Sequence, residues 1–145
     1  MDLQRWYQQK VKGKIEERDN DNVMKKEIEI KFSDEAYKEY RELQESVAKG
    51  KQAKKKPTYE QLLTSINNAL RNIKTDYKYG DLIPREYITK NIINEYGTDK
   101  IFRVELVGYW RLLYTLIGND VKIIAFILEY MDHDRYNKLF GYRKK

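Results

Sequence analysis

The stretch FRVELVGYWRLLYTLIGNDVKIIAFIL, residues 102–128, determines the fold that this chain is expected to adopt. It contains three runs of mostly apolar residues, which are separated by Gly108 and by the turn Gly118-Asn119-Asp120. Short turns between such runs are typical of neighbouring antiparallel strands. The third run, from Val121 to Leu128, is apolar on both sides apart from Lys122, as expected for a central strand whose two faces are covered. We therefore expect three adjacent antiparallel strands.

A further strand and two helices are expected before this region. Apolar and charged residues alternate over residues 26–32, which predicts a half-buried strand. Ser33 and the two acidic residues after it are typical of a helix start, and they predict a first helix over about residues 34–48. Thr58 is placed to cap a second helix, whose apolar stripe would lie against the sheet. The predicted fold is α+β: an antiparallel sheet of about four strands with an N-terminal helical hairpin packed on it.

The length of 145 residues favours a single folded domain. This domain is expected to span residues 24–145 and to contain a third, short helix from Arg85 to Tyr96 that ends at Gly97. Residues 1–23 hold equal numbers of acidic and basic side chains, with apolar residues at roughly helical spacing. We interpret them as an N-terminal extension, either a helix or a disordered arm.

The composition narrows the classes of function. Lys and Arg number 29 against 23 Asp and Glu, and the net charge of +6 favours an anionic partner. The absence of Cys excludes disulfides, thiolate zinc sites and a cysteine nucleophile. No apolar stretch has the length of a signal peptide or a membrane span, so a cytoplasmic protein without membrane contact is expected. Residues 49–57 hold five lysines and form either a solvated connector or a nonspecific contact to nucleic acid.

Arginine residues in the predicted sheet are candidates for phosphate binding. Arg111 lies within an apolar strand, where burying its guanidinium is costly unless it pairs with a carboxylate or faces a groove. One interpretation is a salt bridge with Glu105 or Glu129. The other is a two-pronged contact that stabilises the charge on a reacting phosphate. Arg103, on the preceding strand, has the same two interpretations.

The segment after the last strand carries the protein's single histidine, His133. Histidine exchanges protons near neutral pH, which suits cleavage of RNA by its own 2′-hydroxyl, although a surface histidine is more often inert. Tyr136 follows three residues later, the spacing of neighbours on one helical face, and either stacks on a base, donates to a phosphate or packs on the sheet. Arg135 and Lys138 add positive charge. Asp132 and Asp134 flank the histidine, but these ligands match no usual metal set, and we expect neither a metal nor a cofactor.

The predicted elements follow the order strand, helical hairpin and three-stranded meander. The chain also contains YWRLLY at residues 109–114 and, after the last strand, the pattern His133-x-x-Tyr136. This combination resembles toxins of the RelE/ParE superfamily, and in particular the RelE-like branch of that superfamily. The resemblance implies the toxin of a type II toxin–antitoxin module, an endoribonuclease that needs no metal and cuts mRNA in the ribosomal A site, leaving a cyclic phosphate. It implies a cognate antitoxin as partner. It also places Arg111, His133 and Tyr136 in the catalytic site. The expected RNA-binding residues are Arg103, Lys100, Lys90, Arg135 and Lys138.

The superfamily also contains ParE-like members, which inhibit gyrase and lack ribonuclease residues. A gyrase inhibitor or a catalytically inactive relative is therefore the alternative interpretation, and a basic RNA-binding protein outside toxin modules is a third. The general base stays open, because family members distribute this role among Lys, Arg, His, Glu and Tyr. The combination of Arg111, His133 and Tyr136 favours the ribonuclease branch.

Overall fold

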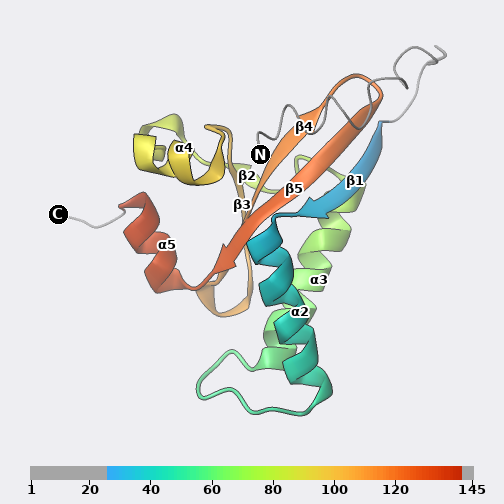
Figure 1. The fold of residues 1–145 in the computed structure, drawn as a ribbon, viewed down its shortest axis with the longest axis vertical. Coiled ribbons are helices and arrows are strands. Elements are labelled where there is room, and N and C mark those ends of the chain that lie inside the picture. The colour runs from blue at the N-terminus through green and yellow to red at the C-terminus, as the bar shows by residue number, and fades with distance from the viewer. Residues whose placement is uncertain (1–25, 142–145) are drawn as a thin grey trace.

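A five-stranded sheet forms the centre of the protein (Figure 1). The computed structural model describes residues 26–141, so the predicted extension at residues 1–23 lies outside them. The strand order across the sheet is β1-β5-β4-β3-β2. The strands are β1 (Glu27–Phe32), β2 (Asp81–Leu82), β3 (Phe102–Glu105), β4 (Arg111–Gly118) and β5 (Lys122–Met131).

The three strands predicted from residues 102–128 are confirmed, since β3 pairs antiparallel with β4 and β4 antiparallel with β5. The expected number of about four strands is wrong, because β2 adds a fifth at the edge of β3. A strand of two residues is too short to produce an alternating pattern. The expectation of a purely antiparallel sheet is also wrong: β1 runs parallel to β5, its neighbour in the sheet.

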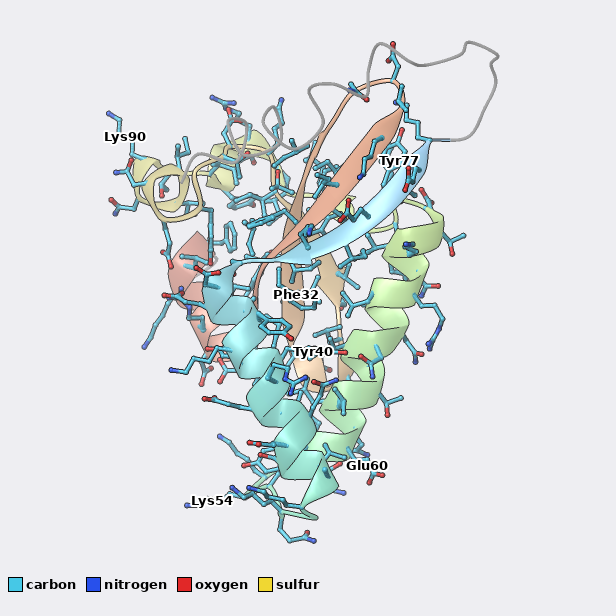
Figure 2. All side chains as sticks on the ribbon, turned by 45° about the vertical axis from the view of Figure 1, so that its right-hand side comes forward. Phe32, Tyr40, Lys54, Glu60, Tyr77 and Lys90 are labelled. Atoms are coloured by element: carbon cyan, nitrogen blue, oxygen red, sulfur yellow. The ribbon has the colours of Figure 1, made fainter. Side chains whose placement is uncertain are left out.

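Two long helices, α2 (Asp34–Ala48) and α3 (Tyr59–Thr75), lie side by side over one face of the sheet (Figures 1 and 2). Both predicted helix starts are confirmed. Ser33 Oγ accepts a hydrogen bond from Ala36 N, and Thr58 forms a reciprocal capping box with Gln61. Such caps satisfy backbone N–H groups that the first turn leaves free. The Tyr40 hydroxyl, labelled in Figure 2, donates to Asn67 Oδ1 at 2.5 Å and joins the two helices.

The opposite face carries shorter helices. The predicted helix from Arg85 to Tyr96 is divided into a 3-10 turn, η2 (Arg85–Tyr87), and the helix α4 (Lys90–Tyr96). The division arises because Thr89 is an extended residue whose hydroxyl caps α4, while Gly97 ends α4 in the left-handed conformation, as predicted. The C-terminal segment forms α5 (His133–Phe140), with Asp132 as its cap. Within residues 26–141 no helix is long and apolar enough to cross a membrane.

The sheet separates two apolar cores. The core under α2 and α3 contains buried residues of both helices and of the central strands: Leu43, Leu62, Ile66, Ile73, Leu112, Tyr114 and Ile127. The core under α4 and α5 contains Ile92, Ile101, Leu113, Leu128, Met131, Tyr136 and Phe140. Burial on both faces explains why the central strands are apolar on both sides.

A β-bulge interrupts β5. Leu113 pairs with Glu129 while the next residue, Tyr114, pairs with Ile127, so Leu128 has no counterpart in β4. The extra residue reverses the alternation of side chains beyond it. Ser33, at the start of α2, donates from its backbone N to Ile127 O at 2.8 Å and from its hydroxyl to Leu128 O at 3.0 Å. The bulge is therefore bound directly to the first helix.

Tyr114 provides a test of the core under α2 and α3. Its hydroxyl accepts a hydrogen bond from Gly80 N at 2.8 Å and donates to Tyr77 O at 2.9 Å. We expect Tyr114→Phe to lower the free energy of unfolding at pH 7 by about 1–3 kcal/mol, because two backbone groups lose their partner. Unfolding in urea measures this loss.

The same substitution should change the alkaline limit of stability. Burial raises the pKa of Tyr114 to about 12. Because this value lies above that of an unfolded tyrosine, about 10, the contribution of neutral Tyr114 is complete below about pH 10 and is lost as the pH rises through about 12. The decline of stability between these pH values should be shallower in Tyr114→Phe than in the wild type. Equal slopes would contradict the prediction.

Candidate functional site

Arg111 is buried at the start of β4, on the face that carries α5. Its side chain is 10% exposed, and its guanidinium lies 4.8 Å from the centre of the Tyr136 ring. Nη1 donates a hydrogen bond to the carbonyl of Tyr109. Nε has no hydrogen-bond partner among the described residues, and the Glu105 carboxylate is 3.8 Å away from it. Of the two salt bridges that the sequence allows, the structure forms the one with Glu105, at a long distance.

Tyr136 joins α5 to the sheet. The residue is 1% exposed, and its hydroxyl accepts a hydrogen bond from Arg103 Nη1 at 2.8 Å. Its ring packs against Phe140, with the ring centres 4.8 Å apart. Stacking on a base requires an exposed ring face, which Tyr136 lacks in this arrangement. Its contacts instead orient the guanidinium groups of Arg103 and Arg111.

His133 is exposed in the first turn of α5. Its Nε2 lies 3.1 Å from Asn137 Nδ2, and its ring centre is 6.0 Å from that of Tyr109. Tyr109 therefore connects two of the three predicted catalytic residues: its carbonyl accepts a hydrogen bond from Arg111 and its ring lies beside His133. The structure thus brings Arg103, Arg111, His133 and Tyr136 into one cluster around the β3–β4 hairpin. Tyr109 begins the YWRLLY pattern, but the sequence gives no reason to expect a functional role for it.

An open groove of about 780 Å³ extends from His133 between α2, α5 and the loop before α3. We call this the hairpin groove. Its lining includes Leu43, Trp110 and Tyr130, the lysines 54–56 with Pro57, and Asp132, His133 and Asp134. The lysines belong to the stretch that the sequence leaves open between a connector and a nucleic-acid contact. A Cβ atom built on Gly108 would lie 2.8 Å from Pro57 Cδ, so the loop touches the hairpin directly.

The lining of the hairpin groove is also acidic, since Asp132 and Asp134 belong to it. Glu39 and Glu42 of α2 belong to it as well. Burial raises the pKa of Glu39, and the nearby carboxylates of Glu129, Glu35 and Glu42 act in the same direction. An anionic ligand in the groove would be repelled by these carboxylates and attracted to the lysines.

The other predicted RNA-binding residues are distributed over the surface. Lys138 is exposed on α5, and Lys100 precedes β3, at the end of that strand away from the hairpin. Lys90 begins α4 and points outward from it (Figure 2). Arg135 is held by Glu95 and Glu129, and its hydrogen bonds to Glu129 raise its pKa. Lys90 and Lys100 are therefore not gathered with Arg111. No group of three or more His, Cys, Asp or Glu side chains within residues 26–141 is arranged to hold a metal.

Glu129 connects three elements on the α5 side. Its carboxylate accepts hydrogen bonds from the Tyr96 hydroxyl of α4 at 2.5 Å and from Arg135 Nε of α5 at 2.9 Å. Arg135 Nη2 also donates to Glu129 at 3.1 Å and to Glu95 at 2.9 Å. Burial and the bond to Glu129 raise the pKa of Tyr96. This network positions α5, and with it His133.

Comparisons with known proteins give a similarity in structure but no match in sequence. No family model and no curated protein matches the chain. Among solved structures, the chain is similar to a YoeB/ParE toxin from Agrobacterium tumefaciens, with 13% sequence identity and a TM-score of 0.47. The match covers 72% of this chain and 98% of that chain.

The Glu129 network yields a prediction about stability. Glu129→Gln removes the charge from hydrogen bonds that link β5 to α4 and α5, and we expect it to lower the free energy of unfolding by about 1–3 kcal/mol. Backbone amides of α5 should exchange with deuterium faster than in the wild type. Glu86→Gln, at an exposed position of η2, is the matched control and should change stability by less than about 0.5 kcal/mol. Equal effects of the two substitutions would contradict a role of Glu129 in holding α5.

Proposed function

We propose that this protein is the toxin of a type II toxin–antitoxin module and acts as an endoribonuclease on mRNA in the ribosomal A site. The observation that carries the proposal is the state of Arg111. Its side chain is nine-tenths buried, its Nε lacks a hydrogen-bond partner within the described residues, and an exposed histidine lies on the other side of Tyr109. Burying an incompletely bonded guanidinium is costly, and a phosphate oxygen is the acceptor that such a group binds best.

Glu105 does not prevent this binding. Its carboxylate is 62% exposed and stands 3.8 Å from Arg111 Nε, so the ion pair is long and one partner is largely in solvent. Exposed pairs of this kind contribute little to stability. An incoming phosphate would take the place of the carboxylate at the guanidinium of Arg111.

The reaction that fits this pair of residues is attack of an RNA 2′-hydroxyl on the adjacent phosphorus. The new P–O2′ bond forms as the P–O5′ bond breaks, which leaves a 2′,3′-cyclic phosphate and a free 5′-hydroxyl. One proton leaves the 2′-oxygen and one joins the departing 5′-oxygen. His133 carries one of these protons, while Arg111 stabilises the additional negative charge on the phosphate.

The remaining residues have supporting roles in this proposal. Tyr136 and Arg103 hold Arg111 in place, through the ring contact and the hydrogen bond described above. The lysines 54–56, which line the hairpin groove, attract the RNA backbone. The partner of the resting protein is a cognate antitoxin, as the resemblance to RelE-like toxins implies.

Substitution of Arg111 and His133 tests the reaction. Removal of one group that stabilises a developing negative charge typically lowers a rate by about 100- to 1,000-fold, and we expect this loss for Arg111→Ala. Arg111→Lys should restore little, because an ammonium group lacks the planar fork. His133→Ala should lower the rate by at least about 100-fold. Primer extension on mRNA after induction of each variant measures cleavage.

Arg85→Ala is the matched control. Arg85 belongs to η2, outside the cluster, and its side chain is 70% exposed and pairs with Asp99. It should keep the growth arrest and the cleavage pattern of the wild type. Full cleavage by both Arg111→Ala and His133→Ala would refute the proposed catalytic roles. Arrest of DNA replication with unchanged transcript ends would instead favour the ParE-like alternative.

The lysine loop provides a separate prediction. Lys54 and Lys55 line the hairpin groove, whereas Lys49 and Lys51 of the same loop do not. A double Lys→Gln substitution at 54 and 55 should weaken binding of a 2′-O-methylated RNA oligonucleotide. The slope of the logarithm of the binding constant against the logarithm of the salt concentration should also become shallower, by roughly 0.7 for each phosphate that the variant no longer neutralises. The same substitution at 49 and 51 removes equal charge and should leave that slope nearly unchanged. Fluorescence anisotropy over a series of salt concentrations measures both, and equal slopes would place the RNA elsewhere.

A further inference from the structure

The turn of the β3–β4 hairpin contains two consecutive residues in the left-handed conformation. Gly108 has φ of 66°, and Tyr109 has φ of 64°. Tight hairpin turns of this kind select Gly, Asn or Asp at such positions, because at positive φ the Cβ atom comes too close to the following carbonyl oxygen. Glycine has no Cβ atom, and Asn and Asp compensate with a local hydrogen bond. A bulky aromatic residue with positive φ is an outlier. Tyr109 is the single non-glycine residue within residues 26–141 that has positive φ.

Three contacts hold the turn in this conformation. Val107 N donates a hydrogen bond to Ser65 Oγ of α3 at 3.0 Å. Gly108 lies against Pro57, with no room for a Cβ atom. The guanidinium of Arg111 donates to the carbonyl of Tyr109 itself. Strained residues persist where surrounding contacts determine their conformation in this way, and they concentrate at functional sites.

Packing does not compensate for this strain. Tyr109 is 71% exposed, more than any other large apolar residue that the structure describes. Its neighbours in sequence, Gly108 and Trp110, line the hairpin groove, and its ring centre is 6.0 Å from that of His133. The fold thus holds an aromatic ring in solvent at the edge of the groove, where glycine or asparagine would satisfy the turn better.

We propose that Tyr109 is a substrate-contacting residue whose ring stacks on an unpaired RNA base next to the phosphate that is cleaved. The proposal rests on the ribonuclease function proposed above and adds a residue to its site. The carbonyl of Tyr109 binds Arg111 and its ring lies beside His133, so a base on the ring has its own phosphate near both groups. Every base presents a flat face, so the stack binds single-stranded RNA of any sequence.

The test compares Tyr109→Gly and Tyr109→Phe with the wild type on mRNA in translating ribosomes. Tyr109→Gly removes the ring and the strain together. Its rate of cleavage should therefore fall by roughly 5- to 150-fold, the range that corresponds to the loss of one base–aromatic stack, while its midpoint of thermal unfolding stays equal or rises. Tyr109→Phe keeps the ring and should cleave at nearly the wild-type rate. A purely structural role predicts the opposite: lower stability in Tyr109→Gly with unchanged cleavage per folded molecule.

Tyr79→Ala is the matched control, because Tyr79 is also an exposed tyrosine, 46% accessible, in the turn before β2. It should cleave at the wild-type rate. If the wild type cleaves mRNA and Tyr109→Gly cleaves it equally fast, the role of Tyr109 is refuted while the ribonuclease function stands. If the wild type leaves all transcripts intact, the ribonuclease function fails first and the role of Tyr109 fails with it.

Discussion

The bulge at Leu128 is the constraint on which the rest of the structure depends. Without an extra residue, the alternation along β5 would place Glu129 under α2 and α3, and Tyr130 under α5. With it, Tyr130 reaches the core under the long helices, while Glu129 meets Tyr96 and Arg135 on the other face. The same shift lets β5 continue to Met131 and start α5 beside the hairpin. The hydrogen bonds from Ser33 stabilise the bulge from the helix side, so one irregularity positions both layers.

Those features that depend on local sequence could be predicted, and those that depend on contacts between distant segments could not. The caps at Ser33 and Thr58 and the helix end at Gly97 are properties of a few consecutive residues, and the structure confirms them. The bulge leaves no trace in the apolar run of β5, because both faces there are buried and either register satisfies the pattern. The parallel pairing of β1 with β5 joins segments almost a hundred residues apart, which no local pattern encodes.

The candidate site divides in the same way. Arg111 is identifiable from sequence because a charge in an apolar strand is costly, and His133 because it is the single histidine of the chain. Tyr109 is not, because the sequence places it in the second predicted strand, where a tyrosine is unremarkable, whereas the structure starts β4 at Arg111 and gives Tyr109 a positive φ. The lysine loop is recognisable as charged, but its place beside His133 follows from the contact of Pro57 with Gly108 across the fold.

Two arginines on the α5 side of the sheet show how partners determine which cation is available to a ligand. Arg135 forms hydrogen bonds with both Glu129 and Glu95, and these carboxylates neutralise it within a network that stabilises α5. Arg111 is more deeply buried, yet it has one backbone hydrogen bond, one aromatic ring and one distant carboxylate. A buried cation with unused donor capacity gains more from a phosphate than an exposed one that is already paired, because its desolvation cost has been met during folding. For this reason the buried arginine, and not the accessible one, is the stronger candidate for the reacting phosphate.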